Sequence, residues 1–299
     1  MLTAEVFFAF MALLYTLLYF FARIENMNLR ESVLPPGWYP RNPCEISGFL
    51  SGFESGNAVA AIAPHAGWYY SGRTAARAVS SLDPSARTIA VIGGHLPAGM
   101  RALFALEDAV QTPLGQVPID TEFRDILITE LKAGEDRFHD NTVEVLLPML
   151  RFFFPDASIV WMRLPAETAS YDAGKIIAGC AKKAGYKVCV LASADLTHYG
   201  LNYDFSPKGL GPNALRWVAE VNDARFIEAV QAGEPETVIR RANLEKSCCS
   251  AGSVAGAMGF SHALGALPAK LLEYTSSAAK SEQCPDSFVG YAALSFNPA

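Results

Sequence analysis

Residues 58–67 read AVAAIAPHAG, an apolar run that ends at Pro64 and is followed directly by His65. The same arrangement, an apolar run followed by a histidine, occurs in TIAVIGGH (residues 88–95) and in KVCVLASADLTH (residues 187–198). Short apolar runs closed by Gly, Pro or Ser are typical of strands buried in a parallel sheet. The sequence therefore predicts parallel strands that each carry a histidine just beyond the carboxyl end.

These three histidines, His65, His95 and His198, are expected to meet in space. In open α/β sheets, ligands bind in the crevice outside the carboxyl ends of the strands. The chain has only five histidines in 299 residues. Three of them at strand ends indicate a metal site or an acid–base site.

Composition narrows the class of protein. The net charge of −6 and the pI of about 5.4 offer no basic face for nucleic acid, and the sequence holds no cluster of lysines or arginines. The six cysteines include no CxxC pair. This spacing argues against a disulfide scaffold and against a structural zinc site, and it is typical of a protein from a reducing, cytoplasmic compartment.

From residue 58 onward, strand-like and helix-like stretches alternate. This pattern predicts an α/β fold, a single domain with a central, mostly parallel sheet flanked by helices. The expected strands are residues 58–63, 88–93, 102–107, 157–163, 187–193, 269–275 and 288–296. The expected helices are residues 72–81, 120–132, 142–152, 172–184, 212–231, 235–243 and 250–264. Residues 27–57, rich in Pro and Gly, are expected to run along the surface.

The first 26 residues form a separate hydrophobic segment ahead of the domain expected over residues 27–299. Residues 6–22 are uncharged and mostly apolar, and a membrane-spanning helix needs roughly 17–25 such residues. Positive charge follows this run, so a transmembrane helix here would anchor the domain to the inner membrane on its cytoplasmic side. The alternative interpretation is that translation starts at Met27 and that residues 1–26 are a spurious extension.

The turn after each of the first two strands suits a ligand. Pro64 and Gly67 fix a tight turn around His65, and two glycines before His95 allow a close approach of the backbone. Two neutral imidazoles from adjacent strand ends are a natural pair of metal ligands. The alternative is that each histidine only bonds the backbone of its turn. Trp68 and Tyr69 either wall a pocket or belong to the core.

The third strand is followed by a carboxylate and an imidazole three residues apart, Asp195 and His198. On a helical turn these two side chains would share one face. Asp195 would then fix the tautomer of His198, as general acid–base catalysis requires. The alternative interpretation makes Asp195 a helix N-cap.

A vicinal pair of thiols, Cys248 and Cys249, precedes an expected helix of small residues. A thiol near a helix N-terminus has a lowered pKa, which favours a thiolate ligand or nucleophile. Free cysteine is otherwise among the most buried residue types, and the core is the alternative place for both thiols.

Several motifs in this order resemble the Memo family, known in prokaryotes as AmmeMemoRadiSam system protein B. The resemblance spans residues 31–296. Its motifs are GWYP (residues 37–40), APHAGWYYSG (63–72), Gly94-His95, TPLGQVPID (112–120), VEV (143–145), SADLTHYG (193–200), Cys249 and FVGYA (288–292).

The resemblance implies a fold similar to that of the class III extradiol dioxygenases, which hold non-haem iron at their strand ends. It implies that His65, His95 and Cys249 bind iron or copper, with Cys248 as the alternative thiol. His198 matches the acid–base histidine of the dioxygenases, and Asp195 lies beside it. One departure is Asp140-Asn141-Thr142, where the family usually has Glu-His-Ser. This missing histidine argues against carrying over a family substrate or reaction.

Three functions follow as expectations. The first is metal-dependent redox chemistry on a small molecule, in the manner of a non-haem oxidoreductase with a dioxygenase-like fold. The second is a non-enzymatic module that binds a peptide or a small ligand. The third, implied by the family's prokaryotic name alone, is a partner of a radical-SAM system. The chain holds no CxxxCxxC cluster motif, so radical chemistry would belong to that partner.

Overall fold

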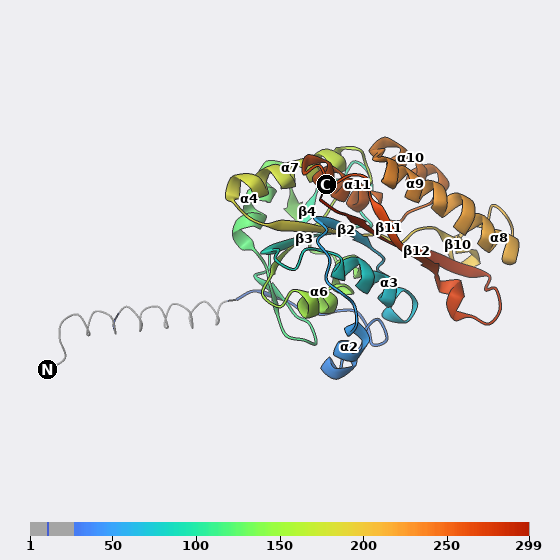
Figure 1. Ribbon diagram of the computed structural model, residues 1–299, viewed down its shortest axis with the longest axis horizontal. Coiled ribbons are helices and arrows are strands. Elements are labelled where there is room, and N and C mark those ends of the chain that lie inside the picture. The colour runs from blue at the N-terminus through green and yellow to red at the C-terminus, as the bar shows by residue number, and fades with distance from the viewer. Residues whose placement is uncertain (1–10, 12–26, 299) are drawn as a thin grey trace.

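Four parallel strands form the centre of the main sheet (Figure 1). The computed structural model describes Met11 and residues 27–298 of the chain. The central strands lie in the order β2 (Ala60–Ala63), β9 (Val188–Ser193), β3 (Thr88–Gly93) and β8 (Ser158–Arg163). Every residue of β2, β3 and β9 is buried, as expected for strands covered by helices on both faces.

Antiparallel pairings extend the sheet on both sides. The long strand β12 (Ser287–Phe296) pairs with β2 and also with β10 (His198–Gly200) and β11 (Lys270–Ser276). On the other side, β4 (Leu103–Phe104) pairs antiparallel with β8. The edge strand β7 (Gly134–Glu135) pairs parallel with β4. A small second sheet consists of β1 (Leu29–Arg30), β5 (Ala109–Val110) and β6 (Val117–Pro118).

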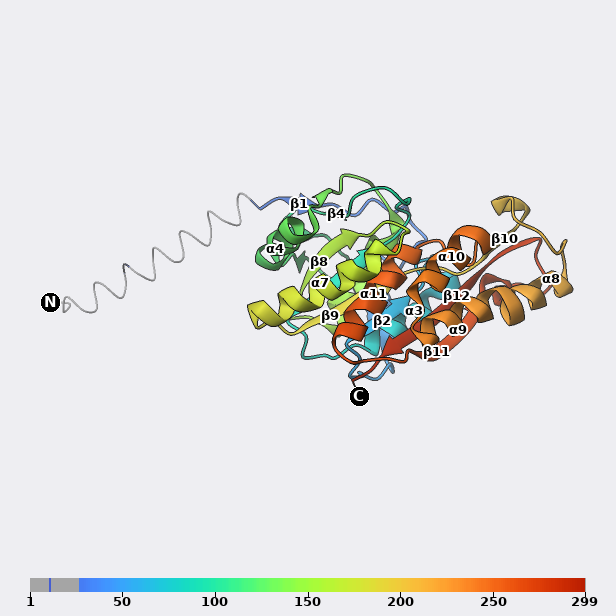
Figure 2. The same ribbon diagram turned by 90° about the horizontal axis from the view of Figure 1, so that it is seen from above.

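Helices cover both faces of the main sheet (Figures 1 and 2). One face packs against α4 (Thr121–Leu131), α7 (Ala169–Ala184), α9 (Ala224–Ala232), α10 (Pro235–Glu245) and α11 (Ala251–Ala263). The other face packs against α2 (Pro43–Leu50), α3 (Trp68–Ser80) and α6 (Leu147–Phe153). The remaining α-helices among the described residues are α5 (Asn141–Glu144) and α8 (Pro212–Trp217).

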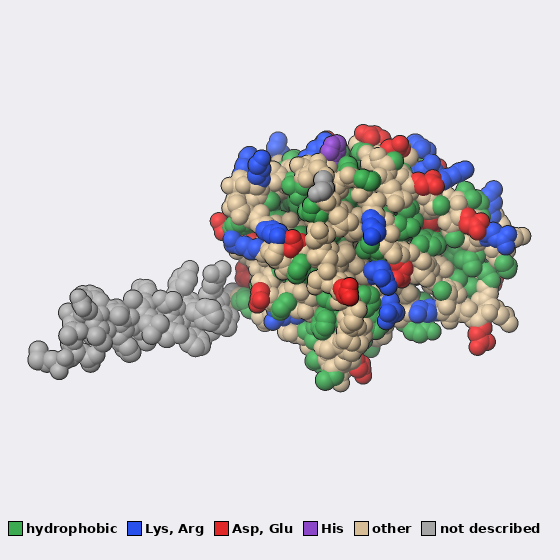
Figure 3. All heavy atoms as spheres, in the orientation of Figure 1, with side chains coloured by type: hydrophobic (Ala, Val, Ile, Leu, Met, Phe, Trp, Pro, Cys, Tyr) green, Lys and Arg blue, Asp and Glu red, His purple; other side chains and the backbone are tan. Residues whose placement is uncertain are grey.

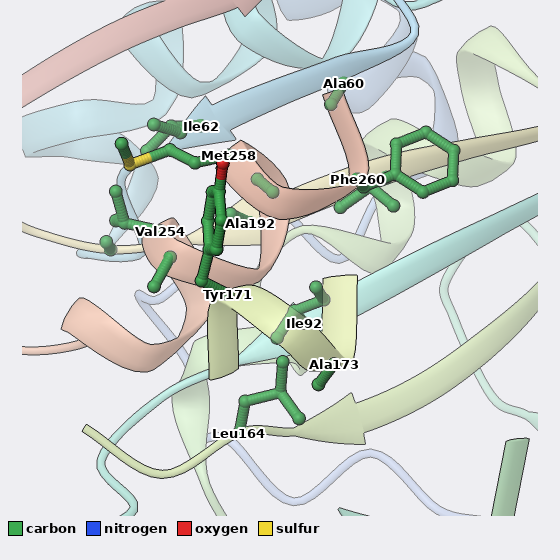
Figure 4. Packing of buried hydrophobic residues seen from close by; sticks show 14 of the residues in the cluster. Ala60, Ile62, Ile92, Leu164, Tyr171, Ala173, Ala192, Val254, Met258 and Phe260 are labelled. Atoms are coloured by element: carbon green, nitrogen blue, oxygen red, sulfur yellow. The ribbon is translucent and has the colours of Figure 1, made fainter. Parts of the chain in front are cut away.

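The two cores follow the alternation of side chains along each strand. Ile62, Ile92 and Ala192 point to the face covered by α7 and α11, whereas Val91 and Leu191 point to the opposite face. Figure 4 shows Val254 and Met258 of α11 near Ile62 and Ala192, with Tyr171 of α7 beside them. This packing fixes α11, and with it the residues that precede its first turn.

The predicted fold class, an α/β domain with a central sheet flanked by helices, is confirmed. Six of the seven predicted strands lie where expected, whereas the strand predicted at residues 102–107 is reduced to the two residues of β4. The predicted helix at residues 142–152 is two helices, α5 and α6, because Pro148 in the first turn of α6 has no N–H for a helical bond. The predicted helix at residues 212–231 is interrupted by a π-helical segment, Val218–Asp223. Residues 27–57, expected to run along the surface, contain α2, which buries Ile46 and Leu50.

Two predictions must be corrected: the transmembrane helix at residues 6–22 and the membrane anchoring that was derived from it. Within the described part of the chain, none of the helices is both long and apolar enough to cross a membrane. The longest described α-helix, α7, has 16 residues and is about 24 Å long at a rise of about 1.5 Å per residue, whereas a bilayer core is about 30 Å thick. Residues 6–22, apart from Met11, lie outside the described residues.

Acidic and basic side chains are interspersed on the face of the molecule shown in Figure 3. Neither sign of charge dominates that face. A surface of this kind gives no long-range electrostatic preference for one class of charged partner.

Candidate metal centre

Three polar side chains lie at equivalent positions beyond three neighbouring strands. His65 follows the last residue of β2 by two positions, His95 follows β3 by two, and Asp195 follows β9 by two. Because β2, β9 and β3 are adjacent and parallel, their carboxyl ends meet at one edge of the sheet. The topology therefore brings the three side chains together.

His65 is buried, and its ring orientation is fixed by Ser193 at the end of β9. The Ser193 hydroxyl donates to the carbonyl of Thr142, so its oxygen accepts from Nδ1 of His65 at 2.9 Å. This bond places the proton on Nδ1 and leaves Nε2 free as a lone-pair donor. Burial, with a further contribution from His95, lowers the pKa of His65 to about 3. The ring is therefore neutral at pH 7, as a metal ligand must be.

His95 has a backbone conformation that few residues with a side chain adopt. Its φ is 56°, in the left-handed region. Nδ1 of His95 lies 3.0 Å from Oδ2 of Asp140, which fixes Nδ1 as the protonated nitrogen and leaves Nε2 free. Burial raises the pKa of Asp140, but hydrogen bonds from His95 and Thr142 outweigh it and hold the pKa well below its usual value. Asp140 is therefore a carboxylate at neutral pH.

A glycine before His95 is required by the close approach of Ser250, the residue between the Cys249 thiol and α11. A Cβ at Gly94 would lie 1.7 Å from Oγ of Ser250. The second glycine, Gly93, faces Thr142, and a Cβ there would lie 2.6 Å from its Oγ1. The two glycines thus allow the loop after β3 to pack directly against α5 and the start of α11.

Cys249, rather than Cys248, faces the two histidines. Its Sγ lies 3.3 Å from Nε2 of His65 and accepts a hydrogen bond from the backbone N–H of Asp195 at 3.3 Å. Cys248 is buried in the core cluster on the α11 side of the sheet. Cys249 lies two residues before α11, so the predicted position at a helix N-terminus is correct.

The expected lowering of the thiol pKa at this helix N-terminus is wrong in direction. Burial, with Cys248 and Asp195 nearby, raises the pKa of Cys249 well above its ordinary value. In the described part of the chain, the groups that act on this thiol include a carboxyl group and a second thiol but no cation that would stabilise a thiolate. A bound divalent cation would supply that positive charge and release the thiol proton.

The donor atoms of His65, His95 and Cys249 lie within 4.8 Å of one another. Metal–ligand bonds of about 2.0–2.3 Å place two donors of one tetrahedral ion about 3.5 Å apart, close to the 3.3 Å between Sγ of Cys249 and Nε2 of His65. The two histidine rings are perpendicular, with centroids 5.0 Å apart, and each has Nδ1 engaged in a hydrogen bond, which leaves Nε2 for the ion. The three residues therefore fit a single metal ion.

Asp195 and His198 lie beside this trio but not on a helical turn. Asp195 is in the loop after β9, and His198 begins β10, which pairs with β12. The helical interpretation is wrong because the backbone between Asp195 and His198 pairs with β12. Gly290 of β12 accepts a hydrogen bond from the N–H of Leu196 and donates one to the carbonyl of Thr197. Extended structure replaces the expected turn.

The carboxylate and the imidazole each have a shifted pKa. Asp195 accepts from the backbone N–H of His65 at 2.7 Å, and burial raises its pKa to about 6. Burial also lowers the pKa of His198. Nδ1 of His198 donates to the carbonyl of Leu196 at 3.2 Å. Nε2 of His198 is therefore a free base at neutral pH.

A pocket of about 830 Å³ opens above these residues. His65, His95, Asp195 and His198 lie in its wall, as does Asn141. Aromatic side chains form much of the remaining wall, namely Trp38, Tyr69, Tyr70, Tyr203 and Tyr291. Of the residues predicted to be either pocket or core, Tyr69 belongs to the pocket and Trp68 to the core.

The sequence did not identify the residues that orient the histidines. Ser193 and Asp140 fix the two imidazole rings, and buried Arg163 lies 3.7 Å from Asp140 while binding Asp136 with two hydrogen bonds. The only local signal was Asp140 two positions before Thr142, a pattern typical of a helix N-cap, and Asp140 does cap α5. Its second role depends on the loop after β3 and is visible only in three dimensions.

Replacing Ser193 with alanine is expected to weaken metal binding by about 10–100-fold, because His65 loses the partner that holds its tautomer. A competitive titration with a chromogenic chelator measures this change. Ser261→Ala is the matched control, since Ser261 is equally buried but donates to the carbonyl of Ala257 within α11. Equal affinities for Ser193→Ala and the unmodified protein would show that Ser193 does not orient the ligand.

An α/β sheet with two histidines and a thiol converging at its carboxyl edge defines a candidate metalloprotein. Comparison with known proteins gives the family. The model of the Memo-like proteins matches residues 30–295, and the chain belongs to this family.

Curated relatives are similar along nearly their whole length. A MEMO1 family protein of Archaeoglobus fulgidus is 30% identical over 90% of this chain and 99% of its own. A MEMO1 family protein of Pyrococcus furiosus is 28% identical over 89% of this chain and 98% of its own. Among solved structures, an uncharacterized protein of Escherichia coli K12 is 12% identical, with a TM-score of 0.48, over 80% of this chain and 99% of that one.

The names of these relatives identify neither a metal nor a partner. The predicted partners must be corrected accordingly: nothing in the comparisons or in the described part of the chain supports a radical-SAM partner or attachment to a membrane. What the family and the geometry support is a Memo-like protein with a His–His–Cys group that can hold a metal ion.

Proposed function

We propose that this protein binds iron(II) or copper through His65, His95 and Cys249 and carries out metal-dependent redox chemistry on a small molecule. The observation that carries the proposal is the convergence of the three donor atoms within 4.8 Å, with both histidines in the wall of a pocket of about 830 Å³. Two imidazoles and a soft thiolate suit iron and copper. When bound, such an ion would supply a redox centre with coordination positions open to the pocket.

His198 is the proposed acid–base residue. Its Nδ1 proton is committed to the carbonyl of Leu196, so Nε2 can accept a proton from a substrate hydroxyl in the pocket. Burial keeps the ring neutral at pH 7 by lowering its pKa. Asp195, held by the backbone of His65, is the charged neighbour that would stabilise the protonated ring.

The wall of the pocket favours an uncharged substrate. The described residues that line it include no lysine or arginine, and Asp195 is their only carboxylate. Aromatic rings and serine hydroxyls form the wall away from the histidines. A molecule with a planar apolar part and neutral hydrogen-bonding groups would match this surface.

The alternative function, a binding module without catalysis, is favoured by the exposed aromatic side chains at the pocket. Tyr69 and Tyr70 are 64% and 47% exposed, and their rings meet edge to face with centroids 5.0 Å apart. Tyrosines of this kind are common at binding surfaces. The two functions differ in their need for His198, because a binding module tolerates its loss.

We also propose limits for the domain and a cellular compartment for the protein. The Memo-like domain would occupy residues 27–299. All six cysteines are free thiols, which supports a reducing, cytoplasmic location.

Metal analysis of the full chain, purified anaerobically without a histidine tag, tests the proposed function. Near-stoichiometric iron or copper in the protein, and its disappearance in His65→Ala, would support it. Protein that stays metal-free after reconstitution with both metals would overturn it. His198→Gln then separates the alternatives: an enzyme keeps its metal and loses O₂-dependent turnover of small molecules, whereas a binding module keeps ligand affinity.

A further inference from the structure

Asp223 is a buried carboxylate directly behind the segment that carries Asp195 and His198. It is 0% exposed, and none of the ion pairs among the described residues includes it. Its oxygens accept from the backbone N–H of Thr197 at 3.1 Å, from the Thr197 hydroxyl, and from the Tyr274 hydroxyl at 2.8 Å. Burial raises the pKa of Asp223 to about 6. A carboxylate buried without a cation costs free energy, and the proposed chemistry does not use this one.

The hydrogen bonds around Asp223 are directed at a single residue, Thr197. The side-chain amide of Asn222 donates to the hydroxyl oxygen of Thr197 at 2.8 Å. The hydroxyl proton of Thr197 is therefore directed to Asp223. Asn222 and Asp223 end the π-helical segment Val218–Asp223, and this widened turn lets two consecutive side chains reach the same partner.

The strand β12 holds the same segment from the other side and leaves room for the carboxylate. Gly290 accepts from Leu196 N–H at 2.9 Å and donates to the carbonyl of Thr197 at 3.0 Å. A Cβ at position 290 would lie 2.0 Å from Oδ2 of Asp223. Only a glycine at this position lets Asp223 reach Thr197 while the strand pairing stays intact.

We infer that Asp223 is a positioning residue for His198. By fixing Thr197, it holds the carbonyl of Leu196 at the Nδ1 atom of His198, so the proton stays on Nδ1 and Nε2 remains a free base facing the pocket. The chain of contacts runs from Asp223 through Thr197 to the bond between His198 and Leu196. This inference rests on the acid–base role proposed above for His198.

The test is the tautomer of His198, read from long-range ¹H–¹⁵N spectra of the metal-free full chain with ¹⁵N-labelled histidine. His198→Gln identifies the signal. The unmodified protein is expected to show a single tautomer protonated on Nδ1, and Asp223→Ala is expected to show a mixture of both tautomers. Asp223→Asn keeps one acceptor oxygen for Thr197 and is expected to restore most of the Nδ1 form.

Asp120→Ala is the matched control, because Asp120 is also a buried carboxylate that binds a threonine hydroxyl, that of Thr88, at the opposite end of β3. It is expected to leave the His198 signal unchanged. A folded Asp223→Ala variant with only the Nδ1 form overturns the inference, as does a mixture in the unmodified protein. If Asp223→Ala does not fold, Thr197→Val removes the hydroxyl bond alone, and an unchanged tautomer in that variant overturns the inference.

The metal content of the same samples reports separately on the proposed function. Failure to bind metal would overturn the metal centre and leave the tautomer result standing. An unchanged tautomer would overturn the role of Asp223 and leave the metal centre standing.

Discussion

Replacing Cys249 with alanine is expected to abolish stoichiometric metal binding while the domain stays folded. The substitution removes the only thiol among the three converging donors and leaves two imidazoles, which hold a divalent ion far more weakly. We expect the metal content to fall from about one ion per chain to below about a tenth, because the free energy of binding depends on the complete ligand set. Elemental analysis of anaerobically purified, untagged protein measures this loss.

Cys248→Ala is the control for this prediction. Cys248 is one residue away and more buried, with its side chain in the core on the α11 side of the sheet. Its replacement is expected to lower stability and to leave the metal content unchanged. Metal that survived in both Cys249→Ala and His65→Ala would rule out the proposed centre.

Arg163→Met is expected to destabilise the fold by about 3–5 kcal/mol, the usual cost of leaving one partner of a buried ion pair uncompensated. The guanidinium of Arg163 donates to both oxygens of Asp136 at 2.9 and 3.0 Å. The two side chains are 5% and 0% exposed. Among the described residues, Arg163 is the only ion-pair partner of Asp136, so its replacement leaves that carboxylate unpaired in the interior. Urea unfolding followed by circular dichroism gives the change in free energy of unfolding.

A neighbouring ion pair on the surface provides the comparison. Arg137 pairs with Glu135, and its side chain is 81% exposed. Arg137→Met is therefore expected to leave the free energy of unfolding unchanged within experimental error. The double variant Arg163→Met, Asp136→Leu should recover most of the loss, because the fully buried carboxylate of Asp136 is removed together with its partner. A loss below about 1 kcal/mol in Arg163→Met would contradict the prediction.

The sequence was sufficient to predict the main strands because burial on both faces leaves a clear local signal. The run 88–93, apolar from Ile89 to Ile92, becomes β3 without a shift of either end. Two-residue strands such as β1 and β6 carry no such signal, since only their tertiary partners define them. The periodicity of apolar residues does not distinguish the π-helical turn at Val218–Asp223 from an α-helix. This turn follows from the contact between Asp223 and Thr197.

The site shows the same division between local and tertiary information. His65 and His95 could be placed at one edge of the sheet because the position of a residue after a strand is local information. The choice between Cys248 and Cys249 needed either the family resemblance or the packing of α11. Ser193 could not be recognised as the partner of His65, because the two residues are 128 positions apart. The thiol pKa was predicted in the wrong direction because burial at Cys249 outweighs its place before a helix.

The distance along the chain between the proposed ligands has a consequence for the biosynthesis of the holoprotein. Cys249 and His65 are 184 positions apart, so both histidines leave the ribosome long before the thiol is translated. A nascent chain therefore presents two imidazoles without their third donor, and the pocket lacks β12. The three proposed ligands come together only after α11 has been translated and the domain has folded. The ion would then be delivered to a finished apoprotein rather than captured during synthesis.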